Sequence, residues 1–304
     1  MQSTSIALCG LLAAMVLSPG DQQPTTIRAD VNLVQLHVRV TNREGRAVPG
    51  LTKEAFQLWV DDVPQPITLF LGEDAPVTAG IVVDNSASMA PKRAEVIAAA
   101  LAFARASNPK DQMFVVHFNQ HARLGLPAGT DFTDDVTQLE RAISAFDLGG
   151  TTAIYDALML AETQFQRAEY AAKVVLLITD GGDNSSQASV TDALDGALQA
   201  GIAIYAIGAF DENDRDRRPA LLTMLADQTG GQAYFPGAIP EVTRICVAIA
   251  NDVRQQYTLG FSAAEDGKYH RLRVAVKDAA GGPLDARTRT GYFANRAPHA
   301  RAHK

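Results

Sequence analysis

Carboxylates and hydroxyls gather at three places in the sequence, two of them directly after apolar runs, with no histidine or cysteine beside them. The first run, VTAGIVVD, ends at Asp84 and is followed by Ser86 and Ser88. A later run, KVVLLITD, ends at Asp180, and between the two the segment DLGGTTAIYDAL places threonine hydroxyls after two glycines. Oxygen ligands without nitrogen or sulfur are what a hard cation such as Mg²⁺ selects. These residue types therefore predict a site for a divalent cation.

The elements that must position these groups are predicted from the segment between residues 77 and 250. Apolar runs alternate there with helical patterns, and the runs 79–83, 113–118, 174–178 and 202–207 are nearly continuous in apolar residues. Such runs are typical of parallel strands covered by helices on both faces. Ligands of an open parallel sheet bind beyond the carboxyl ends of its strands, near the point where strand order reverses. We expect the loops at Asp84 and Asp180 to lie there.

Two short zones flank this region and read as strands. The segments VQLHVRV and HRLRVAVK alternate apolar and polar residues. Neither zone is long enough for an independently stable sheet, so we predict that they pair into one small β-sandwich with the α/β domain inserted between them. Pro64 and Pro66 favour a sheet edge for the hairpin that turns at Asp61-Asp62.

The charge of the proposed ligand set bears on function. One or two carboxylates among neutral hydroxyl and water oxygens leave a divalent ion under-neutralised, and Mg²⁺ keeps water where the protein offers too few ligands. A carboxylate from another molecule would complete the coordination shell. The set therefore suits capture of an acidic group.

Three motifs carry a family resemblance. DNSASM resembles the Asp-x-Ser-x-Ser signature of von Willebrand factor A domains, and GGTTAIYDAL and LLITDGGDN resemble that family's threonine and aspartate loops. The flanking segments resemble a bacterial group of secreted proteins with a related domain, so the resemblance covers nearly the whole chain after its first residues. It implies a Rossmann-like doubly wound sheet and a metal-ion-dependent adhesion site. That site would bind Mg²⁺ or Mn²⁺, and then an acidic residue of a protein partner, through Asp84, Ser86, Ser88, Thr152 and Asp180.

Alternatives remain at this stage. Thr151 is the fallback for Thr152 because the threonine is doubled, and serine, threonine and aspartate at these places would also suit helix N-caps. A phosphoesterase-like metal-dependent hydrolase would need a base and a cation, yet the three loops hold no histidine and the nearest cations are Lys92 and Arg93 on the following helix. A third reading is an envelope component whose metal only stabilises loops. We expect a binding module and not an enzyme.

The composition and the first residues of the chain indicate where the protein is located in or outside the cell. The 304 residues carry a net charge of −7 without a cluster of Lys and Arg, which argues against nucleic acid or an anionic membrane as partner. The apolar stretch 5–17 is too short to span a bilayer and resembles a secretory leader, although residues 1–4 lack Lys and Arg. Removal of the leader would leave Cys246 as the one remaining cysteine, so we expect no disulfide. We also expect no transmembrane segment in the mature chain. We therefore expect a secreted, periplasmic or cell-envelope protein with a signal peptide at 1–20, sandwich strands at 31–72 and 253–294, and the metal-binding domain at 75–252.

Overall fold

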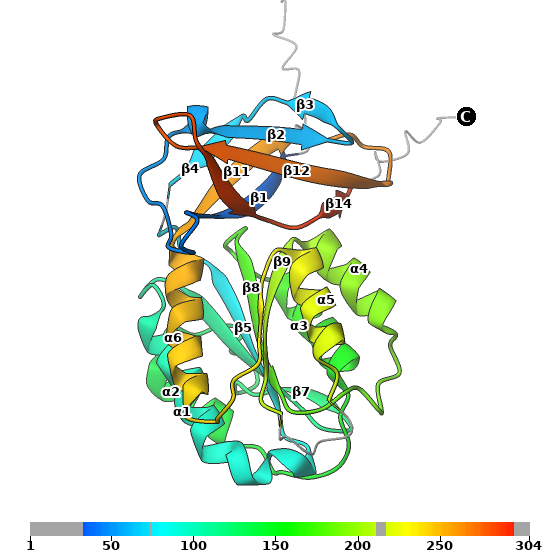
Figure 1. Ribbon diagram of the computed structural model, residues 1–304. Helices are drawn as coiled ribbons and strands as arrows, with labels where there is room; N and C mark the ends of the chain where they lie inside the picture. Colours follow the sequence, from blue (N-terminus) through cyan, green and yellow to red (C-terminus); the bar gives the residue numbers. More distant parts are fainter. Residues whose placement is uncertain (1–32, 73, 211–216, 295–304) are drawn as a thin grey trace, which may run out of the picture. The chain divides into compact units, whose positions relative to one another are not determined.

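The computed structural model describes residues 33–72, 74–210 and 217–294, and its central unit is a six-stranded sheet (Figure 1). The strand order is β10-β9-β8-β5-β6-β7, with every pairing parallel except that between β6 and β7. The predicted apolar runs are confirmed as strands, and β5, β6, β8 and β9 are almost completely buried. The strands are β5 (Thr78–Asp84), β6 (Gln112–Phe118), β7 (Ala122–Leu124), β8 (Lys173–Thr179), β9 (Ile202–Gly208) and β10 (Ala233–Tyr234).

Helices cover both faces of this sheet (Figure 1). On one face the core is built with α1 (Arg93–Ala106), α2 (Val136–Ser144) and α6 (Glu241–Arg254), and it includes the buried free thiol of Cys246. On the other face it is built with α3 (Ile154–Phe165), α4 (Val190–Ala200) and α5 (Pro219–Thr229). The predicted doubly wound α/β fold class is confirmed.

The order of the strands brings two of the predicted loops together. The chain leaves β5 toward β6 on one side and later returns to β8 on the other side of β5. Strand order therefore reverses at β5 and β8, where Val83 is the register partner of Ile178. Asp84 ends β5 and Asp180 directly follows β8, so both carboxylates lie at the carboxyl edge of the sheet where ligands of such folds bind.

Strands from the two flanking zones pair with one another in a second, fully antiparallel sheet. Its order is β3-β2-β12-β13-β1-β11-β4, with β14 also paired to β12. β13 joins two groups of strands through short pairings, with β12 on one side and β1 on the other. The two groups pack their apolar sides on one core. The predicted sandwich is thus one curled sheet of β1 (Leu33–Thr41), β2 (Phe56–Val60), β3 (Val63–Gln65), β4 (Leu69–Leu71), β11 (Gln256–Ser262), β12 (Tyr269–Lys277), β13 (Pro283–Arg287) and β14 (Gly291–Phe293).

The proline-containing hairpin lies at an edge of this sheet, as its sequence predicts. β3 is the terminal strand, and Val60 pairs with Val63 across a two-residue turn. Asp61 and Asp62 have φ angles of 48° and 66°, the left-handed values that a type I′ hairpin turn requires at both central positions. Two short 3₁₀ helices, η1 (Lys53–Ala55) and η2 (Ala87–Lys92), complete the elements.

Two expectations concern the ends of the chain and membranes. The leader at 1–20 lies outside the described residues. In the part of the chain that the structure describes, no helix combines the length and apolarity needed to cross a bilayer.

Glu162 on α3 provides a test of helix packing. Its carboxylate lies against Gly196 of α4, where a built Cβ would come within 2.0 Å of Oε2, and its Oε1 has no hydrogen-bond partner. Burial raises the pKa of Glu162 from 4.5 to about 8. In the unfolded chain Glu162 ionises near pH 4.5, whereas in the folded protein it keeps its proton up to about pH 8. The free energy of unfolding therefore falls as the pH rises from about 4.5 to about 8.

We expect Glu162→Gln to raise the free energy of unfolding at pH 8.5 by about 1–3 kcal/mol, discounted because the group is partly solvated, and to leave it nearly unchanged at pH 4.5. Urea denaturation at both pH values measures this. Glu140→Gln, at an exposed position on α2, is the matched control. An equal effect of Glu162→Gln at the two pH values would contradict the assignment.

Candidate metal centre

Asp84 is a buried carboxylate held at the end of β5. It is 1% exposed; its Oδ1 accepts a hydrogen bond from the Ser86 backbone N–H at 2.8 Å and its Oδ2 from the Thr179 hydroxyl at 2.6 Å. Burial raises the pKa of Asp84 to about 6, opposed by these hydrogen bonds and reinforced by the charge of Asp180. Both oxygens thus have a partner, which fixes the orientation of the carboxylate.

The two serines join the loop after β5 to the loop after β8. The Ser88 hydroxyl donates to Oδ1 of Asp180 at 2.8 Å, and the Ser86 and Ser88 hydroxyl oxygens lie 3.1 Å apart. Ser86 and Asp180 are 2% and 0% exposed, whereas Ser88 is exposed. The cluster is therefore buried on its protein side and reaches solvent at Ser88.

Thr152 lies beside the same loop. It is 5% exposed, and its hydroxyl oxygen lies 3.8 Å from where a Cβ on Gly181 would be. Its backbone N–H donates to Oδ1 of Asn184 at 2.8 Å, and its carbonyl accepts from the Asn184 backbone N–H at 3.0 Å. Thr151 is exposed. Of the two threonines, Thr152 is therefore the one bound to the loop after β8, through its hydrogen bonds with Asn184.

Helix capping does not explain these side chains. Ser86 occupies the N-cap position of η2, but its side chain makes no capping hydrogen bond there. The N-cap of α3 is Ala153 and not Thr152, and the N-cap of α1 is Lys92. Capping therefore accounts for neither Ser86 nor Thr152, and the hydroxyls of Ser86 and Ser88 contact the cluster instead.

Lys92 and Thr179 also belong to the cluster, and sequence reasoning did not place them there. The Lys92 ammonium donates to Oδ2 of Asp180 at 2.7 Å, and the residue is only 3% exposed. From the sequence alone, Lys92 is only a cation on the helix that follows the Asp84 loop. Neither residue has a distinguishing sequence signal: Lys92 follows Ala90-Pro91 like an ordinary surface lysine, and Thr179 is the last residue of an apolar strand.

Asn85 and His117 form a chain of hydrogen bonds beneath the loop that follows β5. The Asn85 side-chain amide donates to Nδ1 of His117 at 2.8 Å, and Nε2 of His117 contacts the Ala142 carbonyl at 2.7 Å. Burial lowers the pKa of His117, which is consistent with a neutral imidazole accepting at Nδ1 and donating at Nε2. His117 is therefore a structural residue within β6, and His121 is exposed.

The chemistry of the donor set fits a hard divalent cation. It offers three hydroxyls and two carboxylates, and within the described ranges no group of three or more His, Cys, Asp or Glu side chains could hold a metal. Any ion bound here would depend on hydroxyl oxygens, which Mg²⁺ and Mn²⁺ accept. The Lys92 ammonium on Asp180 shows, independently, that a positive charge is stabilised at this place.

Comparison with known proteins identifies the class. The family model of the von Willebrand factor type A domain matches residues 80–245, more than half of the chain, and the protein belongs to this family. A search of curated proteins found no match.

Solved structures share the fold at low sequence identity. A von Willebrand factor type A protein from Catenulispora acidiphila matches with a TM-score of 0.54 and 15% identity over 88% of this chain and 75% of its own. Proximal thread matrix protein 1 of the mussel byssus matches with a TM-score of 0.52 and 19% identity over 64% of this chain. The match spans about half of the mussel chain, 51%.

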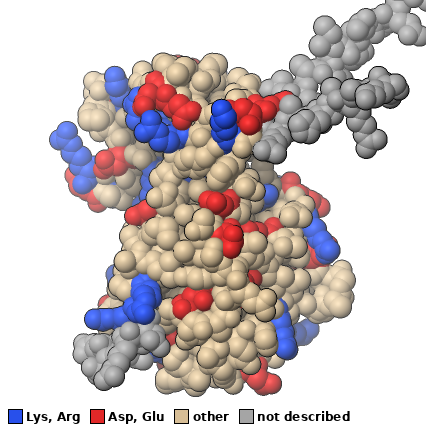
Figure 2. Space-filling model, turned by 90° about the vertical axis from the view of Figure 1, so that its right-hand side faces the viewer, with Lys and Arg blue, Asp and Glu red and all other residues tan. Residues whose placement is uncertain are grey.

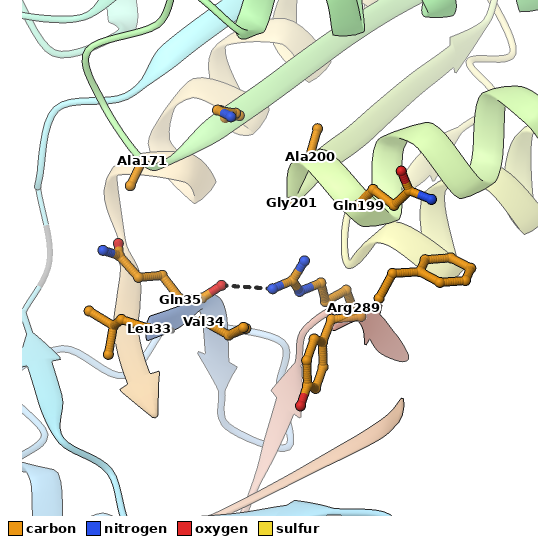
Figure 3. A pocket seen from close by; sticks show the side chains of 11 residues that line it. Leu33, Val34, Gln35, Ala171, Gln199, Ala200, Gly201 and Arg289 are labelled. Atoms are coloured by element: carbon orange, nitrogen blue, oxygen red, sulfur yellow. Dashed lines mark hydrogen bonds between the residues drawn. The ribbon is translucent and has the colours of Figure 1, made fainter. Parts of the chain in front are cut away.

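A separate cavity of about 220 Å³ lies away from these loops, beside β1 and the end of α4 (Figure 3). Arg289 crosses it and donates to the carbonyls of Gln35 at 3.0 Å and Leu198 at 2.9 Å, the first of which Figure 3 marks. Among the described residues, the charged side chains that line the cavity are Arg289 and Lys173, and none is a carboxylate. Arg289 therefore links β1 to the C-terminal end of α4. The described lining has no anionic side chain that would bind a metal cation.

Proposed function

We propose that this protein binds a divalent cation, Mg²⁺ or Mn²⁺, and uses it to capture an acidic residue of a protein partner. The supporting observation is that Ser86, Ser88 and Asp180, from loops 92 residues apart in sequence, form one hydrogen-bonded cluster that opens to solvent at Ser88. The five residues predicted from the motifs would hold the ion: Asp84, Ser86, Ser88, Thr152 and Asp180.

The residues would divide the work according to their surroundings. The hydroxyls of Ser86, Ser88 and Thr152 would bind the ion directly, while Asp84, whose oxygens already accept two hydrogen bonds, is suited to act through water. The bound ion would supply a positive charge that attracts an incoming carboxylate. The protein's own part is to orient the hydroxyls and to bury the two aspartates.

The choice of ion has a second candidate. The mussel byssus protein has also been solved with a zinc-occupied MIDAS motif, the metal-ion-dependent adhesion site, and that structure matches this chain with a TM-score of 0.50 and 19% identity. The oxygen-only donor set favours Mg²⁺ or Mn²⁺ here. Zn²⁺ therefore belongs in the test as a competing ion.

Domains of this family generally serve as interaction modules, and we propose a non-catalytic role in a secreted, periplasmic or cell-envelope location. Among the residues that the structure describes, the Lys92 ammonium in the cluster is paired with Asp180, and the cluster holds no imidazole or thiol to act as a base. Figure 2 shows basic and acidic side chains in small scattered groups on the face in view, with no continuous area of one sign among the residues described there. This surface suits recognition at one site more than adsorption to a polyanion.

The test combines metal and partner binding. We expect one Mg²⁺ or Mn²⁺ to bind to the wild-type chain in calorimetry, and its affinity to fall at least about tenfold in Ser86→Ala/Ser88→Ala, because the variant loses two oxygen ligands. Ser262→Ala, at an exposed strand end, is the control.

A pull-down from envelope extract should recover a partner in Mg²⁺ and lose it in EDTA and with the double variant. Metal-dependent release of phosphate from a generic ester would instead support a hydrolase. If the partner were retained equally in EDTA, the metal would serve only to stabilise the loops and not to bind the partner.

A further inference from the structure

Lys92 is a buried ammonium at the point where the loops after β5 and β8 meet. Its Nζ lies 2.7 Å from Oδ2 of Asp180, and the two side chains are 4% and 0% exposed. A charge taken out of water is stabilised only where it is paired. This ion pair is therefore a buried structural interaction within the site and not a surface contact.

The position of Lys92 in the chain makes the pairing more informative. Lys92 is the last residue of η2 and the N-cap residue of α1, and its side chain makes no capping hydrogen bond there. Neither capping nor solvation accounts for a buried lysine there. The carboxylate of Asp180, which also accepts the Ser88 hydroxyl on its other oxygen, supplies the stabilisation.

The formal charges give the consequence for metal binding. With both aspartates ionised, Asp84, Asp180 and Lys92 sum to −1, whereas the two carboxylates alone would give −2. A divalent ion held by Asp180 would share that carboxylate with the ammonium, and like charges close together in a buried site repel each other. The lysine therefore opposes the same ion that the aspartates attract.

We propose that Lys92 is an internal cation of this site, which holds the loops assembled when no metal is bound and lowers the affinity for the divalent ion. The inference rests on the proposed metal-binding function. A metal-loaded site that retains Lys92 carries one more positive charge than it would without the lysine. The residue that weakens metal binding therefore also strengthens the attraction for an incoming carboxylate.

Lys92→Met tests this with two measurements on the full chain: calorimetry with Mn²⁺ alone, and thermal unfolding in EDTA and in Mn²⁺. We expect Mn²⁺ to bind at least about tenfold more tightly than to wild type, because removal of one nearby unit charge is worth at least that factor. We also expect the melting temperature of Lys92→Met to fall in EDTA and to rise in Mn²⁺ by more than that of wild type, because a more tightly bound ion stabilises the folded chain more.

Two controls separate charge from side-chain loss. Lys92→Arg keeps the positive charge and should bind Mn²⁺ within a few-fold of wild type. Lys110→Met makes the same replacement at an exposed loop position and should change neither measurement.

The outcomes are distinct. Equal Mn²⁺ affinity of wild type and Lys92→Met would overturn the role of Lys92 and leave the metal site standing. Absence of Mn²⁺ binding by wild type and by every variant would overturn the proposed function itself. Failure of both Lys92→Met and Lys92→Gln to fold even in Mn²⁺ would also overturn the inference, since the metal is expected to replace the lysine.

Discussion

Asp180→Ala should lower the free energy of unfolding in EDTA by about 3–5 kcal/mol, because it leaves the buried Lys92 ammonium without its carboxylate. The change also removes the acceptor of the Ser88 hydroxyl. Urea denaturation followed by circular dichroism at neutral pH measures the loss. Asp147→Ala, at an exposed position in the loop before Thr152, should stay within about 0.5 kcal/mol of wild type.

The double variant Asp180→Ala/Lys92→Met shows whether the loss comes from the Lys92 charge that no longer has the Asp180 carboxylate beside it. Removing both partners leaves no buried charge between them, so the double variant should be more stable than Asp180→Ala alone. Strict additivity of the two single losses would mean that Lys92 and Asp180 are not energetically coupled.

Asp252→Ala is the second large effect, and it concerns the connection of α6 to the antiparallel sheet. Asp252 is a buried residue of α6 whose carboxylate lies 2.5 Å from Nη2 of Arg39 on β1 and 3.4 Å from Nη2 of Arg287 on β13. Burial raises the pKa of Asp252, and the two arginines oppose that rise. We expect the substitution to lower the free energy of unfolding by about 3 kcal/mol, since two partly buried guanidinium groups lose their carboxylate.

Chemical denaturation measures this loss, with Asp134→Ala as an exposed control. Asp252→Asn keeps the shape and one acceptor oxygen, so its loss should be smaller than that of Asp252→Ala. A loss below about 0.5 kcal/mol for Asp252→Ala would show that the ion pairs contribute nothing net, as exposed pairs do.

Much of the fold was predictable because burial on both faces leaves a simple pattern. The runs at 79–83, 113–118, 174–178 and 202–207 are strands, and strands between two helix layers are typically apolar at nearly every position. β7, at Ala122–Leu124, has no such pattern because it is a short antiparallel edge partner of β6. That strand is defined by its neighbour and not by its own residues.

The candidate site was predictable in its motifs and not in its internal contacts. The spacing of Asp84, Ser86 and Ser88, and the position of Asp180 after an apolar run, are local sequence features that a sheet turns into one cluster. The burial of Lys92 depends on a residue 88 positions away, so the sequence gives no local sign of it. For the same reason the hydrogen bond from Thr179 to Asp84 required the structure.

An anomalous-difference map from crystals soaked in Mn²⁺ at a saturating concentration tests the metal site most directly. We expect a single strong peak in contact with the hydroxyl oxygens of Ser86, Ser88 and Thr152, and its disappearance in Ser86→Ala/Ser88→Ala. An empty map at these hydroxyls, or a peak bound elsewhere on the chain, would contradict the proposal that these loops hold a divalent ion.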